Sequence, residues 1–169
     1  MKKAFNYLVV LIILPLIFSS CTKNQVYEDS ISFPNSTWQR IEEGKDITFE
    51  KIIIKSVKDE YDFNVSFVHK PTINVDEISF ILRIISPSGI SKETIHTIEL
   101  KGRDKAKFIG NNLGEIIDIK EVVKQYSTLP EVGEYKVIIS NYSNKYEIKG
   151  LEQITLEIIK SDLDYKIEK

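Results

Sequence analysis

The chain has little of the residues that usually carry chemistry. Its 169 residues include one cysteine, two histidines, seven glycines and five prolines. A single cysteine, Cys21, excludes a disulfide within the chain and a site built from several thiolates. A formal net charge of −2 gives no excess of basic residues for phosphates, which argues against nucleic-acid binding.

The N-terminal segment has three zones. Two lysines precede an apolar run over residues 7–18, and two serines lead into Cys21. This order is typical of a secretory signal peptide, and the run is shorter than the roughly 20 apolar residues that a transmembrane helix needs. The letters FSSC at residues 18–21 resemble the lipobox that lipoprotein signal peptidase cuts before a lipid-modified cysteine. The sequence predicts removal of residues 1–20 and lipid attachment at Cys21.

Two other interpretations of this segment stay open: an ordinary signal peptide with an unmodified cysteine, and an uncleaved anchor. Lipidation is favoured because the rest of the chain has no other cysteine. Attached acyl chains contribute about 0.8 kcal/mol per buried methylene, so they would hold the protein without a transmembrane helix. The remaining 149 residues, with a net charge of −4, suit one domain. We expect a flexible tether over residues 21–36 and a single domain over residues 37–169.

The segment after residue 36 alternates with a period of two. Apolar side chains at residues 61, 63, 65 and 67 predict a strand with one buried face. Residues 77–86 are more continuously apolar, which predicts a central strand covered on both faces. A Pro-Gly turn joins this strand to residues 93–101 and predicts a hairpin.

Other segments complete the predicted fold. Residues 46–56 are expected to form a strand with Ile47, Phe49 and Ile53 on one side, although Ile52 and Ile54 make the other side partly apolar. Trp38 is expected to fill the core, with a binding role as the alternative. Later strands cover residues 134–142 and 152–159, and the only expected helix covers residues 117–126. The fold class is mainly all-β: an antiparallel β-sandwich, jelly-roll-like, with one short helix.

The search for catalytic and cofactor motifs returns no specific site. His69 ends one strand and His96 lies within another, on the side of Ile98 and Leu100, and both are expected to be structural. Acidic pairs stand beside lysines in turns, where solvation explains them. The letters IGNNLG at residues 109–114 lack a phosphate-loop setting and predict a turn with positive φ angles. No metal, cofactor or catalytic residue is predicted.

An ordered set of segments resembles the GldH-type gliding-motility lipoproteins. The set begins at Cys21 and includes the following segments: FPNSTW, SPSG, KFIGNNLGEIIDIK, VGEYKVIISNY and IKGLEQITLEI. Two segments differ from the family pattern: TINVDEIS ahead of the central strand, and Asn141-Tyr142-Ser143 after the Gly-x-Tyr strand. The resemblance covers nearly the whole chain after Cys21.

The resemblance implies a noncatalytic, lipid-anchored protein of the bacterial cell envelope, facing the periplasm. Its expected partners are other envelope proteins of the gliding-motility and type IX secretion machinery, and it transfers no catalytic residues. Asp29-Ser30-Ile31 is similar to the periplasmic O-glycosylation acceptor of such bacteria, which makes Ser30 a candidate modification site. Its expected exposure would make Ser30 accessible.

Three functional hypotheses remain. In the first, an interaction module binds partners through a sheet face or edge, and Tyr126, Tyr142 and Tyr146 are either exposed contacts or ordinary core and surface aromatics. In the second, a periplasmic or surface lipoprotein binds glycans on a concave sheet face with two or three exposed aromatics. In the third, a hydrolase brings His69 or His96 to a carboxylate and a nucleophile.

Overall fold

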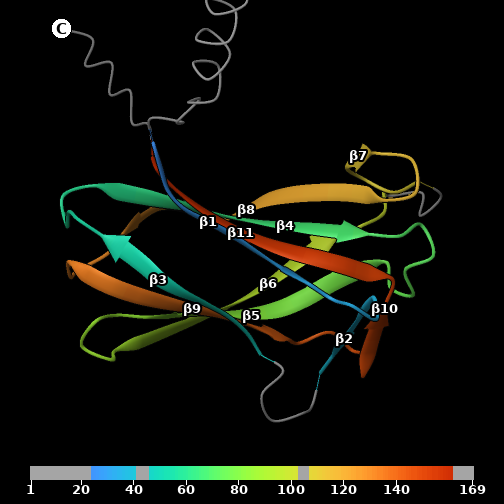
Figure 1. Cartoon of the computed structure of the whole chain (residues 1–169), viewed down its shortest axis with the longest axis horizontal. Helices are drawn as coiled ribbons and strands as arrows, with labels where there is room; N and C mark the ends of the chain where they lie inside the picture. The colour runs from blue at the N-terminus through green and yellow to red at the C-terminus, as the bar shows by residue number, and fades with distance from the viewer. Residues whose placement is uncertain (1–23, 41–45, 103–106, 162–169) are drawn as a thin grey trace, which may run out of the picture.

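The computed structural model describes residues 24–40, 46–102 and 107–161. Every regular element in these ranges is a β-strand, and every strand pairing is antiparallel. The all-β, antiparallel fold expected from the sequence is therefore confirmed. Figure 1 shows two twisted sheets that face each other, with a small ribbon at one end.

Two sheets and one ribbon contain all the strands of the described ranges. The first sheet has the order β1 (Gln25–Ser32), β11 (Leu151–Lys160), β4 (Glu60–His69), β8 (Ile117–Thr128) and β7 (Asn111–Asn112). The second has the order β3 (Ile47–Ile54), β9 (Gly133–Asn141), β5 (Glu77–Ile85) and β6 (Ser91–Glu99). The ribbon pairs β2 (Thr37–Gln39) with β10 (Glu147–Lys149).

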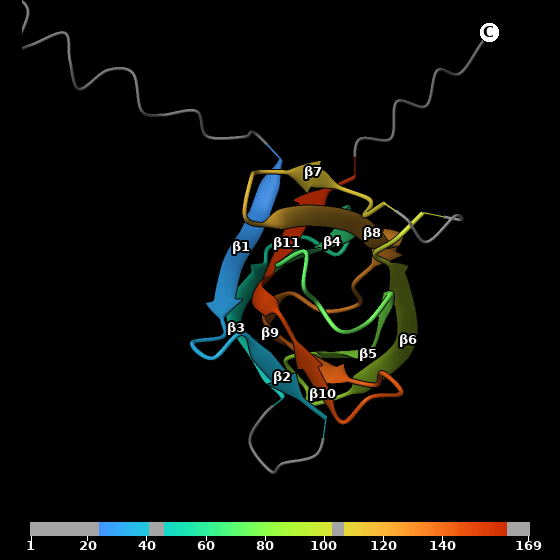
Figure 2. The ribbon, with the colours of Figure 1, turned by 90° about the vertical axis from the view of Figure 1, so that its right-hand side faces the viewer.

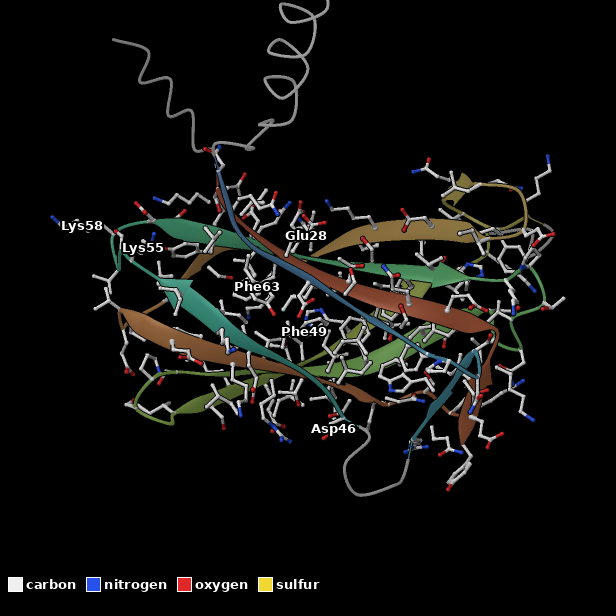
Figure 3. All side chains as sticks on the ribbon, in the orientation of Figure 1. Glu28, Asp46, Phe49, Lys55, Lys58 and Phe63 are labelled. Atoms are coloured by element: carbon white, nitrogen blue, oxygen red, sulfur yellow. The ribbon has the colours of Figure 1, made fainter. Side chains whose placement is uncertain are left out.

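The core lies between the two sheets. Strand β4 points its aromatic and apolar side chains inward, as its alternating pattern predicts, and Phe67 is fully buried. The Phe67 ring lies 5.6 Å from that of Phe80 on β5, so the sheets interlock through aromatic packing. Figure 3 shows Phe49 and Phe63 between the sheets, while Lys58 points into solvent.

The second sheet confirms the predicted hairpin and the central position of residues 77–86, but only one face of this strand is buried, not both as expected. Strand β5 pairs with β9 on one side and with β6 on the other. Its Phe80 and Leu82 are buried, while Ile81 on the opposite face is half-buried. Trp38, on β2, is 1% exposed and lies in the core, as expected.

The predicted helix over residues 117–126 is wrong, because this segment is most of strand β8. Ile117 and Ile119 are buried, and β8 pairs along β4. Two bulges then place extra residues in β8, between the partners of Tyr61 and Asn64. The extra residues interrupt the alternation, and the apolar spacing then mimics that of a helix.

The inward face expected for the strand over residues 46–56 is correct only for its first half. Ile47 and Phe49 are buried, but Ile53 is 46% exposed, and Ile52 and Ile54 take the inward positions. The ladder with β9 shifts between Phe49 and Ile52, and Lys51 has a φ of 60°. This bulge reverses the faces of the residues that follow it.

Residues 25–32, expected to belong to a flexible tether, form β1 at the edge of the first sheet. This strand pairs with β11 over most of its length. Tyr27 and Ile31 pack against the core, which explains why a largely polar segment is ordered. Residues 1–23, including Cys21, lie outside the described ranges.

Candidate functional site

The two histidines occupy structural positions. His69 is fully buried, its Nδ1 lies 2.9 Å from the Lys70 carbonyl oxygen, and its ring lies 5.1 Å from that of Phe108. Burial lowers the pKa of His69. The imidazole is therefore held neutral, with Nδ1 donating to the carbonyl.

His96 lies half-buried at the inner side of β6. Its ring stacks on Phe80 at 5.6 Å, and its Nε2 lies 2.7 Å from Thr94 Oγ1. Burial, and then the charge of Lys124, lower the pKa of His96. Neither histidine contacts a carboxylate in the described ranges, so the structure does not assemble the cluster that the hydrolase hypothesis requires.

Two further expectations concern metals and turns. The described residues include no group of three or more His, Cys, Asp and Glu side chains that could hold a metal ion. Gly110 and Gly114 have φ angles of 110° and 94°, which confirms the turn predicted for residues 109–114. A Cβ at Gly110 would lie 2.5 Å from the Asp118 carbonyl oxygen, so this turn requires glycine.

The three candidate tyrosines are exposed but do not form one surface. Tyr126 lines a hollow of about 310 Å³ beside Ile90. Tyr142 lines a separate hollow of about 360 Å³, where the Arg40 guanidinium lies 5.8 Å from its ring centroid. Tyr146 adjoins Arg40, whose amide donates to the Tyr146 carbonyl oxygen at 2.9 Å. Arg40 therefore contacts the Tyr142 ring and the Tyr146 backbone, while Tyr126 lines a different hollow.

Ser30 is exposed on β1, in a strand and not in a tether. Its Oγ lies 2.8 Å from Thr155 Oγ1 on β11, and its amide donates to Asp29 Oδ1. The O-glycosylation hypothesis thus concerns a surface position of the first sheet.

The two sheets meet along two seams. At one of them, called the closed seam, β1 packs against β3, with a hollow of about 380 Å³ lined by Ile31 and Ile47 at the end near Trp38. Strand β1 lies against β3 there, as Figure 2 shows. Burial raises the pKa of Tyr27 to about 12, with further contributions from Asp29 and from Glu50 of β3. Side chains of β1 therefore cover the space beside β3.

The other seam, between β6 and β8, is open. In the described ranges β6 pairs only with β5, while β8 pairs with β4 and, at its start, with β7. A hollow of about 440 Å³ separates β6 from β8, and the 310 Å³ hollow continues toward Tyr126. The larger hollow is lined by the following residues: His96, Ile98, Glu99, Ile109, Glu121 and Val122.

Two carboxylates without an ion-pair partner among the described residues line the wider part of this open seam, and a third, Glu77, lies on the neighbouring strand β5, where Lys101 lines the same hollow. Glu99 lies directly opposite Glu77 in the β5–β6 ladder, and Glu121 lines the hollow from β8. All three are exposed, and none has an ion-pair partner among the described residues. Like charges in directly opposite positions destabilise a sheet, so this arrangement is not explained by stability.

Sequence reasoning did not find this seam. The hairpin that contains β6 was predicted, but residues 117–126 were expected to be helical, so no second strand edge could be placed beside it. The Glu77 and Glu99 pair follows from the hairpin register and could have been recognised from the turn.

A family model described as GldH lipoprotein matches residues 25–158. The chain belongs to the GldH lipoprotein family. The match begins at the first residue of β1 and ends within β11, so it includes both sheets and the ribbon. No curated protein matches the sequence.

Membership makes the chain a gliding-motility-associated lipoprotein and a lipid-anchored envelope protein. It confirms the resemblance inferred from the sequence. Within the described ranges, no helix has the length and apolar character needed to cross a membrane.

Proposed function

We propose that this GldH-family protein is a noncatalytic interaction component of the gliding-motility and type IX secretion machinery. The family match over residues 25–158 is the observation that supports this proposal. The protein faces the periplasm and is attached through lipid at Cys21. Its rigid β-domain then serves to contact other envelope proteins.

The noncatalytic role is consistent with the positions of the chemical groups. The His69 ring donates to a backbone carbonyl, and the His96 ring contacts Thr94. Glu131, a carboxylate at the end of the molecule, accepts hydrogen bonds from Ser86 and Ser88 and holds a loop. These contacts have structural roles.

Gene deletion tests the proposed role. We expect a deletion strain to lose surface spreading and secretion of type IX cargo, and reintroduction of the full chain to restore both. Normal spreading together with normal secretion in the deletion strain would refute the proposal. Loss of secretion alone would assign the protein to the secretion part of the machinery.

The anchor is tested separately. Cells fed a labelled fatty acid should label the natural chain and leave a Cys21→Ser variant unlabelled. Unchanged label in the variant would contradict attachment at Cys21. A Ser30→Ala variant, which should be labelled normally, is the matched control because it alters a neighbouring candidate modification site only.

The glycan-binding alternative has weaker support. It requires two or three aromatic faces on one concave sheet surface, whereas Tyr126 lies apart from Tyr142. The Tyr142 ring is also covered by the Arg40 guanidinium. Loss of spreading without any change in protein contacts would favour this alternative.

A further inference from the structure

Strand β6 is the one long strand edge in the described ranges that has no bulge, proline or covering segment, and its protection is limited to the charges of Lys92, Glu93 and Glu99. Natural proteins protect edges with bulges, short strands, charged side chains or covering segments, since an open edge can pair with another chain. Strands β1, β3 and β8 have bulges, and β2, β7 and β10 have three residues or fewer. Strand β6 has nine residues in uninterrupted register with β5 and contains no proline.

The hydrogen-bond pattern identifies which backbone groups of β6 point away from β5. The Ser86 amide donates to the Ile90 carbonyl oxygen at 2.9 Å, and the Leu100 amide donates to the Asp76 carbonyl oxygen at 2.8 Å. Even-numbered residues between these positions therefore exchange hydrogen bonds with β5, because such pairs alternate in an antiparallel ladder. The outward-pointing groups belong to Ser91, Glu93, Ile95, Thr97 and Glu99.

The side chains beside this edge provide both apolar and charged groups. Ile95, at the middle of the edge, is 60% exposed on the outer face of the second sheet, where it lines the hollow beside Tyr142, and Val122 on β8 is 47% exposed in the hollow between β6 and β8. Glu99 and Glu121 supply negative charge at one end. Lys92 and Lys124 line the separate 310 Å³ hollow toward the other end of the seam. An extended segment can therefore find apolar contacts at its centre and opposite charges at its two ends.

We propose that β6 accepts an extended segment of a partner envelope protein by strand addition, with Lys or Arg side chains placed at Glu99 and Glu121. This inference rests on the proposed function and specifies the chemistry of the partner. Main-chain hydrogen bonds to the outward groups of β6 provide affinity, and the side chains flanking the seam provide selectivity. The basic side chains also relieve the repulsion between Glu77 and Glu99.

Charge favours such a segment over a second copy of the chain. The outward-facing positions of β6 include two carboxylates and no cation. One of them, Glu93, is already paired with Arg83. A second β6 would add another set of the same carboxylates to the seam, whereas a basic segment would neutralise them.

Cross-linking in cells tests the proposal with the full, lipid-anchored chain. A photoreactive phenylalanine analogue replaces Ile95, and in a second strain it replaces Thr97. The control replaces Ile53, an isoleucine on the outer face of β3 that is 46% exposed. Each strain is first checked for normal protein level and for restored spreading of the deletion strain.

We expect Ile95 and Thr97 positions to give an adduct with one other protein, joined through a segment that contains Lys or Arg. The Ile53 position should give none. Combined Glu99→Lys and Glu121→Lys substitutions should lower the adduct yield about tenfold. An adduct of two copies of this chain, no adduct, equal adducts from Ile53, or a yield unaffected by the charge reversal would overturn the inference.

The two proposals fail in distinguishable ways. Normal spreading and secretion in the deletion strain would remove the proposed function, whatever the cross-links show. Impaired spreading in the deletion strain, with no adduct from β6, would preserve the function and remove strand addition.

Discussion

The two seams of the sandwich differ in how the edge strands of the two sheets meet. At the closed seam, β1 packs Tyr27 and Ile31 against the core, and bulges interrupt both β1 and β3. At the open seam, β6 keeps a regular register and faces a hollow beside β8. The difference indicates that the closed seam serves stability, while the open seam leaves backbone groups available for a partner.

The largest predicted difference between the seams is in stability. Trp38 is buried near Phe33 at the end of the closed seam, with the rings 6.1 Å apart. Its Nε1 has no hydrogen-bond partner among the described residues, so the contribution of Trp38 to stability is expected to come from packing. A Trp38→Ala substitution should lower the free energy of unfolding by about 3–5 kcal/mol in urea titrations.

The matched change at the open seam is Ile95→Ala. Because Ile95 is largely exposed, we expect a loss of less than about 1 kcal/mol. If the Trp38→Ala and Ile95→Ala variants lose similar amounts of unfolding free energy, the closed seam does not stabilise the domain more than the open seam does. That result would contradict the account.

A smaller loss of stability is expected at the closed seam when the pH is raised above 10. Tyr27 stays neutral in the folded protein up to a pKa of about 12, whereas an unfolded tyrosine ionises near its model value of 10.0. Between these values the unfolded chain binds fewer protons, so stability is fully present below pH 10 and falls as pH rises toward 12. Tyr27 should contribute about 1 kcal/mol to this fall after solvent screening.

The Tyr27→Phe variant isolates that contribution. Its unfolding free energy, measured in denaturant from pH 9 to pH 12, should fall less steeply than that of the natural chain. Identical slopes for the two chains would show that β1 does not shield Tyr27 beside Glu50.

The smallest predicted effect is a gain in stability at the open seam. Glu99→Gln removes the repulsion with Glu77 and should raise the unfolding free energy by about 0.5 kcal/mol. The same variant should bind the partner less well. A matched Glu93→Gln variant should gain nothing, since Glu93 is paired with Arg83. A lower unfolding free energy for the Glu99→Gln variant would contradict repulsion between the Glu77 and Glu99 carboxylates.

The sequence predicts the regular parts of this fold better than its irregular parts. Alternation at Tyr61 and Phe63 identifies β4, because each inward side chain is strongly apolar. Bulges have no comparable pattern, so the inward positions of Ile52 and Ile54 and the strand character of residues 117–126 were missed. Strand β1 was also missed, since its order depends on pairing with β11 more than on its own composition.

The candidate site could be predicted only in part. The lone Cys21 and its flanking segment indicate an anchor, and nothing in the described ranges alters that prediction. The open edge depends on which strands lie beside one another in space, and the sequence does not specify that arrangement. The sequence left open whether the three tyrosines are exposed contacts or ordinary core and surface aromatics, and the structure shows that they are exposed and that Tyr126 lies apart.

The most direct test of the account is a pair of proline substitutions on neighbouring residues of β6. The amide of Ile95 points away from β5, whereas that of Thr94 donates within the ladder. We predict that Ile95→Pro leaves the domain folded at a normal level but abolishes spreading and secretion, while Thr94→Pro destabilises the domain itself. Normal spreading and secretion in an Ile95→Pro strain that accumulates normal amounts of folded protein would contradict the account.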